Sequence, residues 1–337
     1  MDELCRQIPP EKFRLTTKTA RVATVKTAHE LLQEKLAIGK AYKPSDIPPA
    51  SVIPRPPFWG RELVRPTDLD LPTICRYINK NALFRGQWGF KQGQELTKDQ
   101  WQELVDREAE PVFKRWIAKA TSEKMLEPQA AYGWWPAASQ QNDLIVFDPA
   151  TGAEVARFNL PRQMEPGSGH KCLADYLRPL GAPALGDEQS WFPAAAWAAG
   201  ARDVIGFSCV TMGHVASQHC QRLFKADNYQ EYLYFYGLSV EAAEGLAEYW
   251  HKRMRQQLNI SQHDAADIAD LFTQGYQGSR YSFGYPACPN LDDQAHLQRL
   301  LRWEDIGIHL SEEFQLDPEQ STSALVFHHP AARYFSL

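Results

Sequence analysis

One short segment, GSRYSFGYPACPN at residues 278–290, combines ligand-binding side chains with residues that bend the chain. Arg280 offers a planar guanidinium whose paired N–H groups suit a carboxylate. Gly284, four residues later, permits a backbone with positive φ and lets a ligand approach the main chain closely. Tyr285 precedes a proline, a position that favours extended backbone. The segment is either a structural turn or a pocket wall, and its residue types alone leave both open.

Histidine and cysteine residues do not form a recognisable metal-binding motif. His214 and His219 are five residues apart with Cys220 adjacent, which is not a standard zinc spacing. His328 and His329 are neighbours on an expected strand, so their side chains should point to opposite faces. We therefore expect no metal site.

Motifs of the common enzyme classes are also missing. The sequence has no G-x-G-x-x-G or G-x-x-x-x-G-K-[ST] phosphate loop and no G-x-S-x-G nucleophile elbow. Cys209 lies in an apolar run, which favours an inert packed thiol over a nucleophile. Glu244, Glu248 and His251 recur at near-helical spacing. We interpret them as a solvated helix face supported by Lys252; the alternative is that one carboxylate turns inward to meet a cationic ligand.

The elements that must position these residues mix helices and strands without a βαβ alternation. One helix is expected at 97–120, with a Thr97–Gln100 cap and a bend near Pro111, and another at 239–258, with Ser239 as its N-cap. Alternating apolar residues predict a hairpin at 142–160 with a Thr151–Gly152 turn, and strands at 202–211 and 321–329. This segregation of helices and strands favours an α+β fold.

The N-terminal part differs from the remainder. Residues 1–46 are rich in lysine and arginine, and a helix is expected at 27–40, with a capping box at its start. Six prolines follow between positions 44 and 57, which indicates an extended linker or a wrapping arm. We expect a basic helical extension or interdomain linker at 1–46 and one domain at 47–337.

Composition narrows the class of protein. The 337 residues carry a net charge of −5 and no basic run, so nucleic acid is not an expected partner. No apolar run approaches the length of a membrane span, and the N-terminus lacks a secretion-signal pattern. Six scattered cysteines without C-x-x-C pairs indicate reduced thiols and a cytoplasmic protein.

Six collinear segments between about residues 56 and 335 resemble the activation domain of cobalamin-dependent methionine synthase. The segment YQGSRYSFGYPACPN resembles that family's R-x-x-x-G-Y-P-A-C-P motif. The other five are INKNALFRGQWGF, YGWWPA, KCLADYLRP (similar to a C-L-A-D-[FY] strand), GLAEYWHKRMR (similar to A-E-x-x-H-x-x-[IVM]-R) and the closing IGIHLSEEFQLDPEQSTSALVFHHPAARYF. Each match alone is weak, whereas six in order are specific.

The resemblance implies a fold and a function. The expected fold is a C-shaped α+β body with a long antiparallel sheet and surrounding helices. The family's domain binds S-adenosylmethionine and re-methylates cobalamin that has oxidised to cob(II)alamin, after one electron arrives from flavodoxin or a flavin reductase. The chain would then be a methyltransferase module for methionine biosynthesis. Positioning of the methyl donor, rather than a catalytic side chain, would carry the reaction.

The resemblance also implies site residues. Arg280 would bind the ligand's carboxylate, and Ser282, Gly284 and Tyr285 would line the adenosine, largely through backbone. The remaining matched positions are Tyr334, Phe335 and Glu244. Asn79 departs from the family pattern, in which an aspartate receives the ligand's amino group. An amide brings no charge, so other acids, Glu244 among them, would have to supply the anion.

The sequence lacks the D-x-H-x-x-G motif of the family's cobalamin domain, as well as folate and homocysteine modules. The chain alone is therefore not expected to run the full cycle, and cobalamin would be held by a cobalamin-binding domain in cis or in trans. Two origins stay open, a fragment of a longer synthase and a stand-alone reactivation protein. The alternative function is a non-catalytic cap or redox-partner adaptor for a corrinoid protein, which Asn79 favours.

Overall fold

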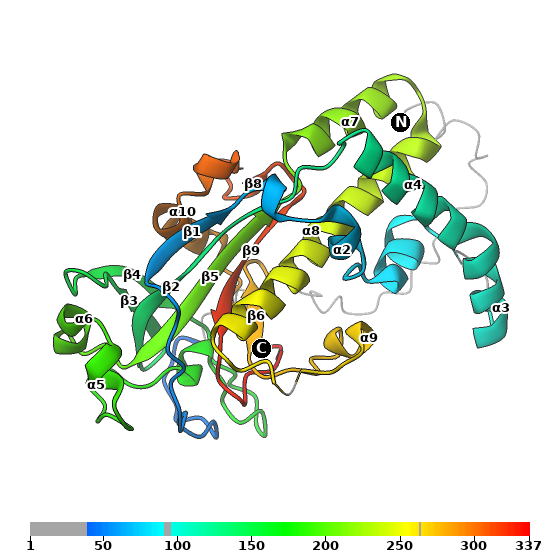
Figure 1. Ribbon diagram of the computed structural model, residues 1–337. Helices are drawn as coiled ribbons and strands as arrows, with labels where there is room; N and C mark the ends of the chain where they lie inside the picture. Colours follow the sequence, from blue (N-terminus) through cyan, green and yellow to red (C-terminus); the bar gives the residue numbers. More distant parts are fainter. Residues whose placement is uncertain (1–38, 91–95, 263) are drawn as a thin grey trace, which may run out of the picture.

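The computed structural model describes residues 39–90, 96–262 and 264–337. Figure 1 shows a long twisted antiparallel sheet with helices on both sides. The strands are β1 (Gly60–Val64), β2 (Gln129–Gln140), β3 (Asp143–Phe147), β4 (Glu154–Asn159), β5 (Asp203–Thr211), β6 (Ser279–Ser282) and β9 (Ser321–Phe327), with a separate pair β7 (His309–Leu310) and β8 (Leu316–Asp317). The α+β class with a long antiparallel sheet is confirmed.

The strand order is β4-β3-β2-β5-β9-β6, and β1 pairs with the first half of β2. On the same side of β2, the partner changes from β1 at Trp134 to β3 at Ala137. Pro136 lies in this gap, where a residue without an N–H can be accommodated in a central strand. The expected hairpin at 142–160 is confirmed as β3 and β4, and the other two expected strands as β5 and β9.

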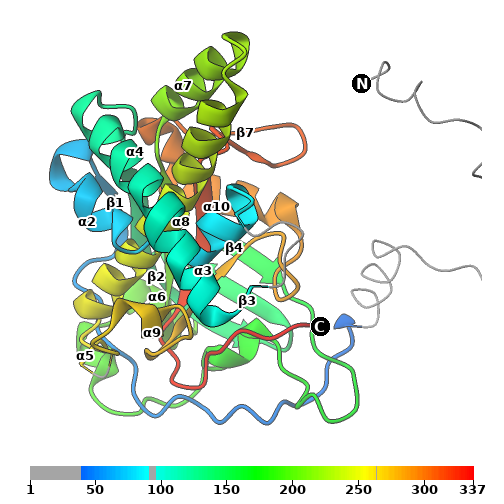
Figure 2. The same ribbon diagram turned by 90° about the vertical axis from the view of Figure 1, so that its right-hand side faces the viewer.

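Alternation along the strands divides the core into two layers. Tyr132 and Trp134 of β2 face one hydrophobic cluster, while Ala131 and Trp135 face the other. The first layer is covered by helices α2 (Leu71–Cys75), α3 (Lys98–Leu104), α4 (Glu110–Ser122), α7 (His214–Lys225) and α8 (Tyr229–Gln257). Figure 2, viewed from that side, shows α4 and α8 across the sheet, α7 at one end and α9 (Ile268–Leu271) at the other.

The opposite face carries shorter elements. These are the 3-10 turns η6 (Leu173–Tyr176), η7 (Leu291–Asp293) and η8 (Trp303–Ile306) and the helix α10 (Gln294–Leu301). The short helices α5 (Glu188–Trp191) and α6 (Ala194–Ala198) belong to the first layer and lie near the β3–β4 end. The expected strand at KCLADYLRP is wrong, because η6 occupies it. Asp175 accepts the backbone N–H of Cys172 and pairs with the buried Arg162, which holds the chain in a tight turn.

Two helix expectations need correction or detail. The Thr97–Gln100 capping box is confirmed at the start of α3, and a π-helical turn, η5 (Val105–Ala109), separates α3 from α4 just before Pro111. Ser239 as N-cap is wrong, because α8 begins ten residues earlier. The hydroxyl of Ser239 is buried inside the helix and donates to the Tyr236 carbonyl. Tyrosines of the first turns pack on neighbouring aromatics, which extends the helix.

The proline-rich segment is a wrapping arm along the described body. The Asp46 N–H donates to the Gly169 carbonyl, and the Pro48 carbonyl is 3.0 Å from His329 Nε2. Ile53 is buried. The expected helix at 27–40 lies almost entirely outside the described residues, and the boundary at residue 47 stays a prediction.

Candidate functional site

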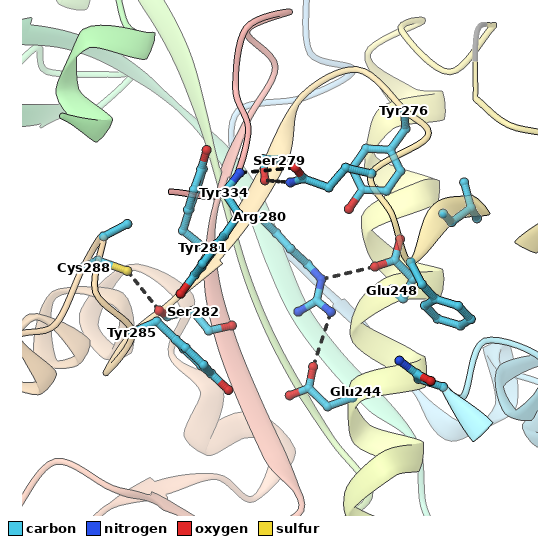
Figure 3. Close-up of a pocket in the computed structure, with 15 residues that line it drawn as sticks. Glu244, Glu248, Tyr276, Ser279, Arg280, Tyr281, Ser282, Tyr285, Cys288 and Tyr334 are labelled. Atoms are coloured by element: carbon cyan, nitrogen blue, oxygen red, sulfur yellow. Dashed lines mark hydrogen bonds and ion pairs between the residues drawn. The ribbon is translucent and has the colours of Figure 1, made fainter. Parts of the chain in front are cut away.

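A cavity of about 290 Å³ lies where β6 and the turn after it face the middle of α8 (Figure 3). A third wall comes from the loop around α9, and the C-terminal segment closes one side. The residues that line it are Asn79, Glu244, Glu248, Leu271, Phe272, Gln274, Tyr276, Ser279, Arg280, Tyr281, Ser282, Tyr285, Ala287, Cys288 and Tyr334. Six of the eight residues expected at the site are among them; Gly284 and Phe335 are not.

The β6 strand aims Arg280 at the helix. It pairs with β9 in the register Arg280–Val326, so Arg280 and Ser282 lie on one face while Tyr281 packs into the core on the other. Gly284 follows with φ +86°, which confirms the expected positive-φ turn. Its N–H donates to the Cys288 carbonyl at 3.1 Å, so this donor is already satisfied within the turn. The Cys288 thiol in turn donates to the Ser282 carbonyl at 2.9 Å.

Two carboxylates of α8 flank the guanidinium of Arg280 (Figure 3). Arg280 Nη2 lies 3.3 Å from Glu244 Oε2, and Nε lies 3.6 Å from Glu248 Oε2. The side chains of Arg280 and Glu248 are 20% and 7% exposed, and that of Glu244 is 46% exposed. Burial is the largest influence on the pKa of Arg280 and lowers it. The attraction of both carboxylates outweighs burial and raises the pKa above its ordinary value.

The helix face that carries these carboxylates is not solvated, so that interpretation is wrong for Glu248 and His251. Both are buried, and burial, followed by the nearby charges of Arg255 and Arg280, lowers the pKa of His251 well below its ordinary value. The spacing of four residues between Glu244 and Glu248 places them on one face of α8. This face of α8 lies against a cation on β6 rather than against water. The spacing of the charged residues in the sequence does not show which of these two environments the face has.

A cluster of buried polar side chains behind the cavity was not predicted from the sequence. Arg255 and Asp264 form an ion pair at 2.8 Å whose side chains are 1% and 5% exposed. The guanidinium of Arg255 lies 3.9 Å from the ring centroid of Tyr276, and His251 packs edge-on against the same ring. Burial, with the charge of Glu248 second, raises the pKa of Tyr276 to about 12. Tyr276 and Asp264 lie in an irregular loop, where no periodic signal marks them.

Asn79 lies at the rim, just beyond α2, and its side chain is exposed. Its Oδ1 accepts the backbone N–H groups of Asn81 at 3.1 Å and Ala82 at 3.3 Å. A glycine on α8 brings this segment close. A Cβ at Gly245 would lie 3.1 Å from Ile78 Cγ1 and 3.2 Å from the Ile74 carbonyl oxygen, so a larger residue would push the segment away.

Two exposed tyrosines stand at the mouth. Tyr285 is 57% and Tyr334 53% exposed, and the Tyr334 N–H donates to Gln274 Oε1 at 3.2 Å. Such exposed rings are available to stack on a planar ligand. Phe335 instead is buried, with its ring centroid 6.5 Å from that of Tyr281, so it supports the wall from behind.

This arrangement favours binding over acid–base chemistry. Burial raises the pKa of the Cys288 thiol, which therefore stays protonated at neutral pH. Cys209 is a packed thiol as expected, since it is fully buried and burial raises its pKa. The cavity offers one cation, two anions and five aromatic rings, a set that suits a small ligand with both charges and a flat group.

Further expectations concern the histidines, a metal site and membrane-spanning helices. His328 and His329 lie beyond β9 instead of on it; His328 Nε2 is 2.7 Å from Asp203 Oδ1. Among the described residues, no group of three or more His, Cys, Asp and Glu could hold a metal ion. Within the same residues, no helix is long and apolar enough to span a membrane.

The comparisons with known proteins agree with this fold. A methionine synthase of Mycobacterium leprae is 37% identical over 345 aligned positions, which cover 97% of this chain and 27% of that protein. A methionine synthase of Mycobacterium tuberculosis is 37% identical over 302 positions, 87% of this chain and 24% of that protein. The chain thus spans about a quarter of the length of these curated relatives.

A solved structure shares the fold. The MetH reactivation domain, crystallised with S-adenosylhomocysteine, superposes with a TM-score of 0.70 and 24% identity, covering 89% of this chain and 88% of that one. The family described as the activation domain of vitamin B12 dependent methionine synthase matches residues 70–337, from α2 to the C-terminus. The chain therefore belongs to the family of methionine synthase activation domains.

Proposed function

We propose that this chain binds S-adenosylmethionine and positions its methyl group for the reductive reactivation of a cobalamin-dependent methionine synthase. One observation carries the proposal: Arg280 projects from β6 into a cavity of small-molecule size, between the two carboxylates of α8. A guanidinium beside acidic groups matches the amino-acid end of S-adenosylmethionine, which carries a carboxylate and an ammonium. The family membership and the shared fold support the same ligand.

The lining suggests a role for each residue. Arg280 binds the ligand's carboxylate, and Glu244 lies within the same acidic site. Ser282 and Tyr285 line the adenosine side, with Gly284 shaping the turn between them. Tyr334 closes the mouth. Phe335 acts indirectly, because it packs against Tyr281 beneath the cavity.

The chemistry asks for alignment rather than for an acid or base. Transfer of a methyl group from a sulfonium is a displacement, so the domain must hold the methyl group along the line of attack and exclude water. Reduced cobalamin supplies the nucleophile. In this proposal it is held by a cobalamin-binding domain, in cis or in trans, because the chain has no D-x-H-x-x-G motif. A flavodoxin or flavin reductase is the proposed electron donor, and the isolated chain does not complete the synthase cycle.

The proposed setting is the cytoplasm, where methionine biosynthesis takes place. The five cysteines within the described residues are all free and buried, which fits a reducing compartment.

Calorimetric titration of the intact chain with S-adenosylmethionine tests the proposal. We expect saturable binding that weakens about 100-fold in Arg280→Met, because two charge-assisted hydrogen bonds are lost. Arg115→Met is the matched control, since Arg115 forms an exposed pair with Glu231 on the helices away from the cavity. Absence of binding to the wild-type chain would refute the proposal.

A second assay separates the catalytic module from a non-catalytic cap. A separately prepared cobalamin-binding domain is mixed with the chain, a reductant and S-adenosylmethionine labelled on its methyl group. The proposal predicts that label reaches the cobalamin and that Arg280→Met abolishes this transfer. If the two domains associate but no label is transferred, the chain is a cap or adaptor.

A further inference from the structure

The ammonium of the proposed ligand needs an acceptor, and this inference rests on the proposed function. In an α-amino acid the ammonium is attached to the carbon next to the carboxylate, so its acceptor must lie beside Arg280. Three side chains that line the cavity are candidates: the carboxylates Glu244 and Glu248, which lie beside Arg280, and Asn79, which stands where the family pattern has an aspartate. They differ in charge, exposure and existing hydrogen bonds, and these differences discriminate between them.

Asn79 is poorly suited to receive a cation. Its Oδ1 already accepts the N–H groups of Asn81 and Ala82, and caps the turn that they begin. The remaining polar group of the amide is its NH₂, which is a donor. A donor cannot bind an ammonium, and the amide has no charge with which to attract one.

Glu244 carries a carboxylate that is about half exposed to water. Its side chain is 46% exposed, and Oε2 is directed to Arg280 Nη2 at 3.3 Å. Solvent screens an exposed carboxylate, and exposed ion pairs contribute little affinity. Glu244 also borders a neighbouring hollow between α8 and β9, so its side chain has room to turn away from the guanidinium.

Glu248 is buried, charged and incompletely paired. Its side chain is 7% exposed, and Oε2 lies 3.6 Å from Arg280 Nε. Among the residues that the structure describes, no donor is within hydrogen-bond distance of Oε1. A buried carboxylate oxygen without a donor is costly, and a ligand that supplies one removes this cost. Rotation about the last side-chain bond of glutamate is soft and nearly two-fold, so either oxygen can turn to the cavity.

We propose that Glu248 accepts the α-ammonium of the ligand, in place of the anion that Asn79 lacks. Arg280 then holds the ligand's carboxylate and Glu248 its ammonium, from neighbouring positions on β6 and α8 (Figure 3). Glu248 is thereby a binding residue that also contacts Arg280. Binding of the ligand and orientation of Arg280 can be distinguished by experiment, because only direct contact with the ligand depends on its amino group.

An affinity cycle tests the contact. Calorimetry compares S-adenosylhomocysteine with its 2-oxo acid counterpart, in which a ketone replaces the amino group, on the wild type, Glu248→Gln and Glu244→Gln. In the wild type, loss of the amino group should weaken binding about 30-fold, as expected for a hydrogen bond between charged groups. The same loss should cost less than about threefold in Glu248→Gln and about 30-fold still in Glu244→Gln.

A gain of function provides an independent readout. In the Glu248→Gln background, Asn79→Asp adds a carboxylate whose second oxygen is not needed for the turn, and dependence on the amino group should return. A purely orienting role for Glu248 predicts instead that Glu248→Gln weakens both ligands equally, and this result would overturn the inference. So would a preference for the amino group that disappears only in Glu244→Gln.

The binding data on the wild type distinguish failure of the proposed function from failure of this inference. If the wild type binds neither nucleoside, the function and the inference both fail. If it binds both equally well, the function stands and only the role of Glu248 is refuted.

Discussion

Replacing Arg280 by methionine should destabilise the protein even without ligand. The substitution keeps an apolar stem of similar length but removes the cation between Glu244 and Glu248, which lie 3.3 and 3.6 Å from it. The two carboxylates, one turn apart on the same face of α8, then lie side by side without a cation between them. Glu248 is the costlier of the two, because its side chain is only 7% exposed.

The two carboxylates contribute different amounts to the expected loss in the free energy of unfolding. Removing one partner of a buried ion pair costs about 3 to 5 kcal/mol. The pair with Glu244 is 46% exposed on the acid side, so solvent screening reduces its share to less than about 1 kcal/mol. Because Arg280 itself remains 20% exposed, the lower end of the buried range applies to its pair with Glu248. We expect a loss of about 3 kcal/mol in the free energy of unfolding at pH 7.

Urea unfolding followed by circular dichroism measures this loss. Arg115→Met, which breaks an exposed pair, should change stability by less than about 1 kcal/mol and is the control. In Arg280→Met combined with Glu248→Gln the unpaired buried charge is gone, so at least half of the loss should be recovered. A double variant no more stable than Arg280→Met would refute the reasoning, because the cost would then come from packing.

Two further outcomes concern the surroundings of the cavity. Burial raises the pKa of Asp293 to about 6, above its ordinary value near 4. As pH rises from 4 to 6, the unfolded chain releases the proton of Asp293 before the folded chain does. The free energy of unfolding therefore falls over this pH range. In thermal scans from pH 4 to 7, the free energy of unfolding of the wild type should fall by about 1 kcal/mol relative to that of Asp293→Asn, after allowance for partial exposure. A difference between the two proteins that does not change with pH would show that Asp293 is not the cause. Asp264→Asn leaves Arg255 without its buried partner and should cost about 3 kcal/mol in urea unfolding, whereas an unchanged midpoint would show that the pair is not stabilising.

The regular parts of the fold could be predicted because their signals are local. The hairpin of β3 and β4, the strand β5 and the capping box of α3 each follow from alternation or from a cap within a few residues. The start of α8 could not be found this way. Its first turns are rich in tyrosine, and contacts with other helices stabilise them more than intrinsic propensity does.

The site was predictable where residues are close in sequence and not where they meet only in space. Arg280, Ser282 and Tyr285 lie within six consecutive residues, and their types indicated a ligand or a bend. Glu248 reaches Arg280 from a different element, so its spacing on the helix could not reveal what it faces. Tyr276 and Asp264 lie in an irregular loop, where burial depends on tertiary contacts alone.

The position of β6 at the end of the sheet has an evolutionary consequence. Within residues 39–90, 96–262 and 264–337, only β9 pairs with this four-residue strand, so the wall that carries Arg280 borders loops rather than another strand. Those loops can change in length and composition without disturbing the ladder that joins β2, β5 and β9. Substitutions in those loops can therefore change ligand preference without changing the strand pairing on which folding depends.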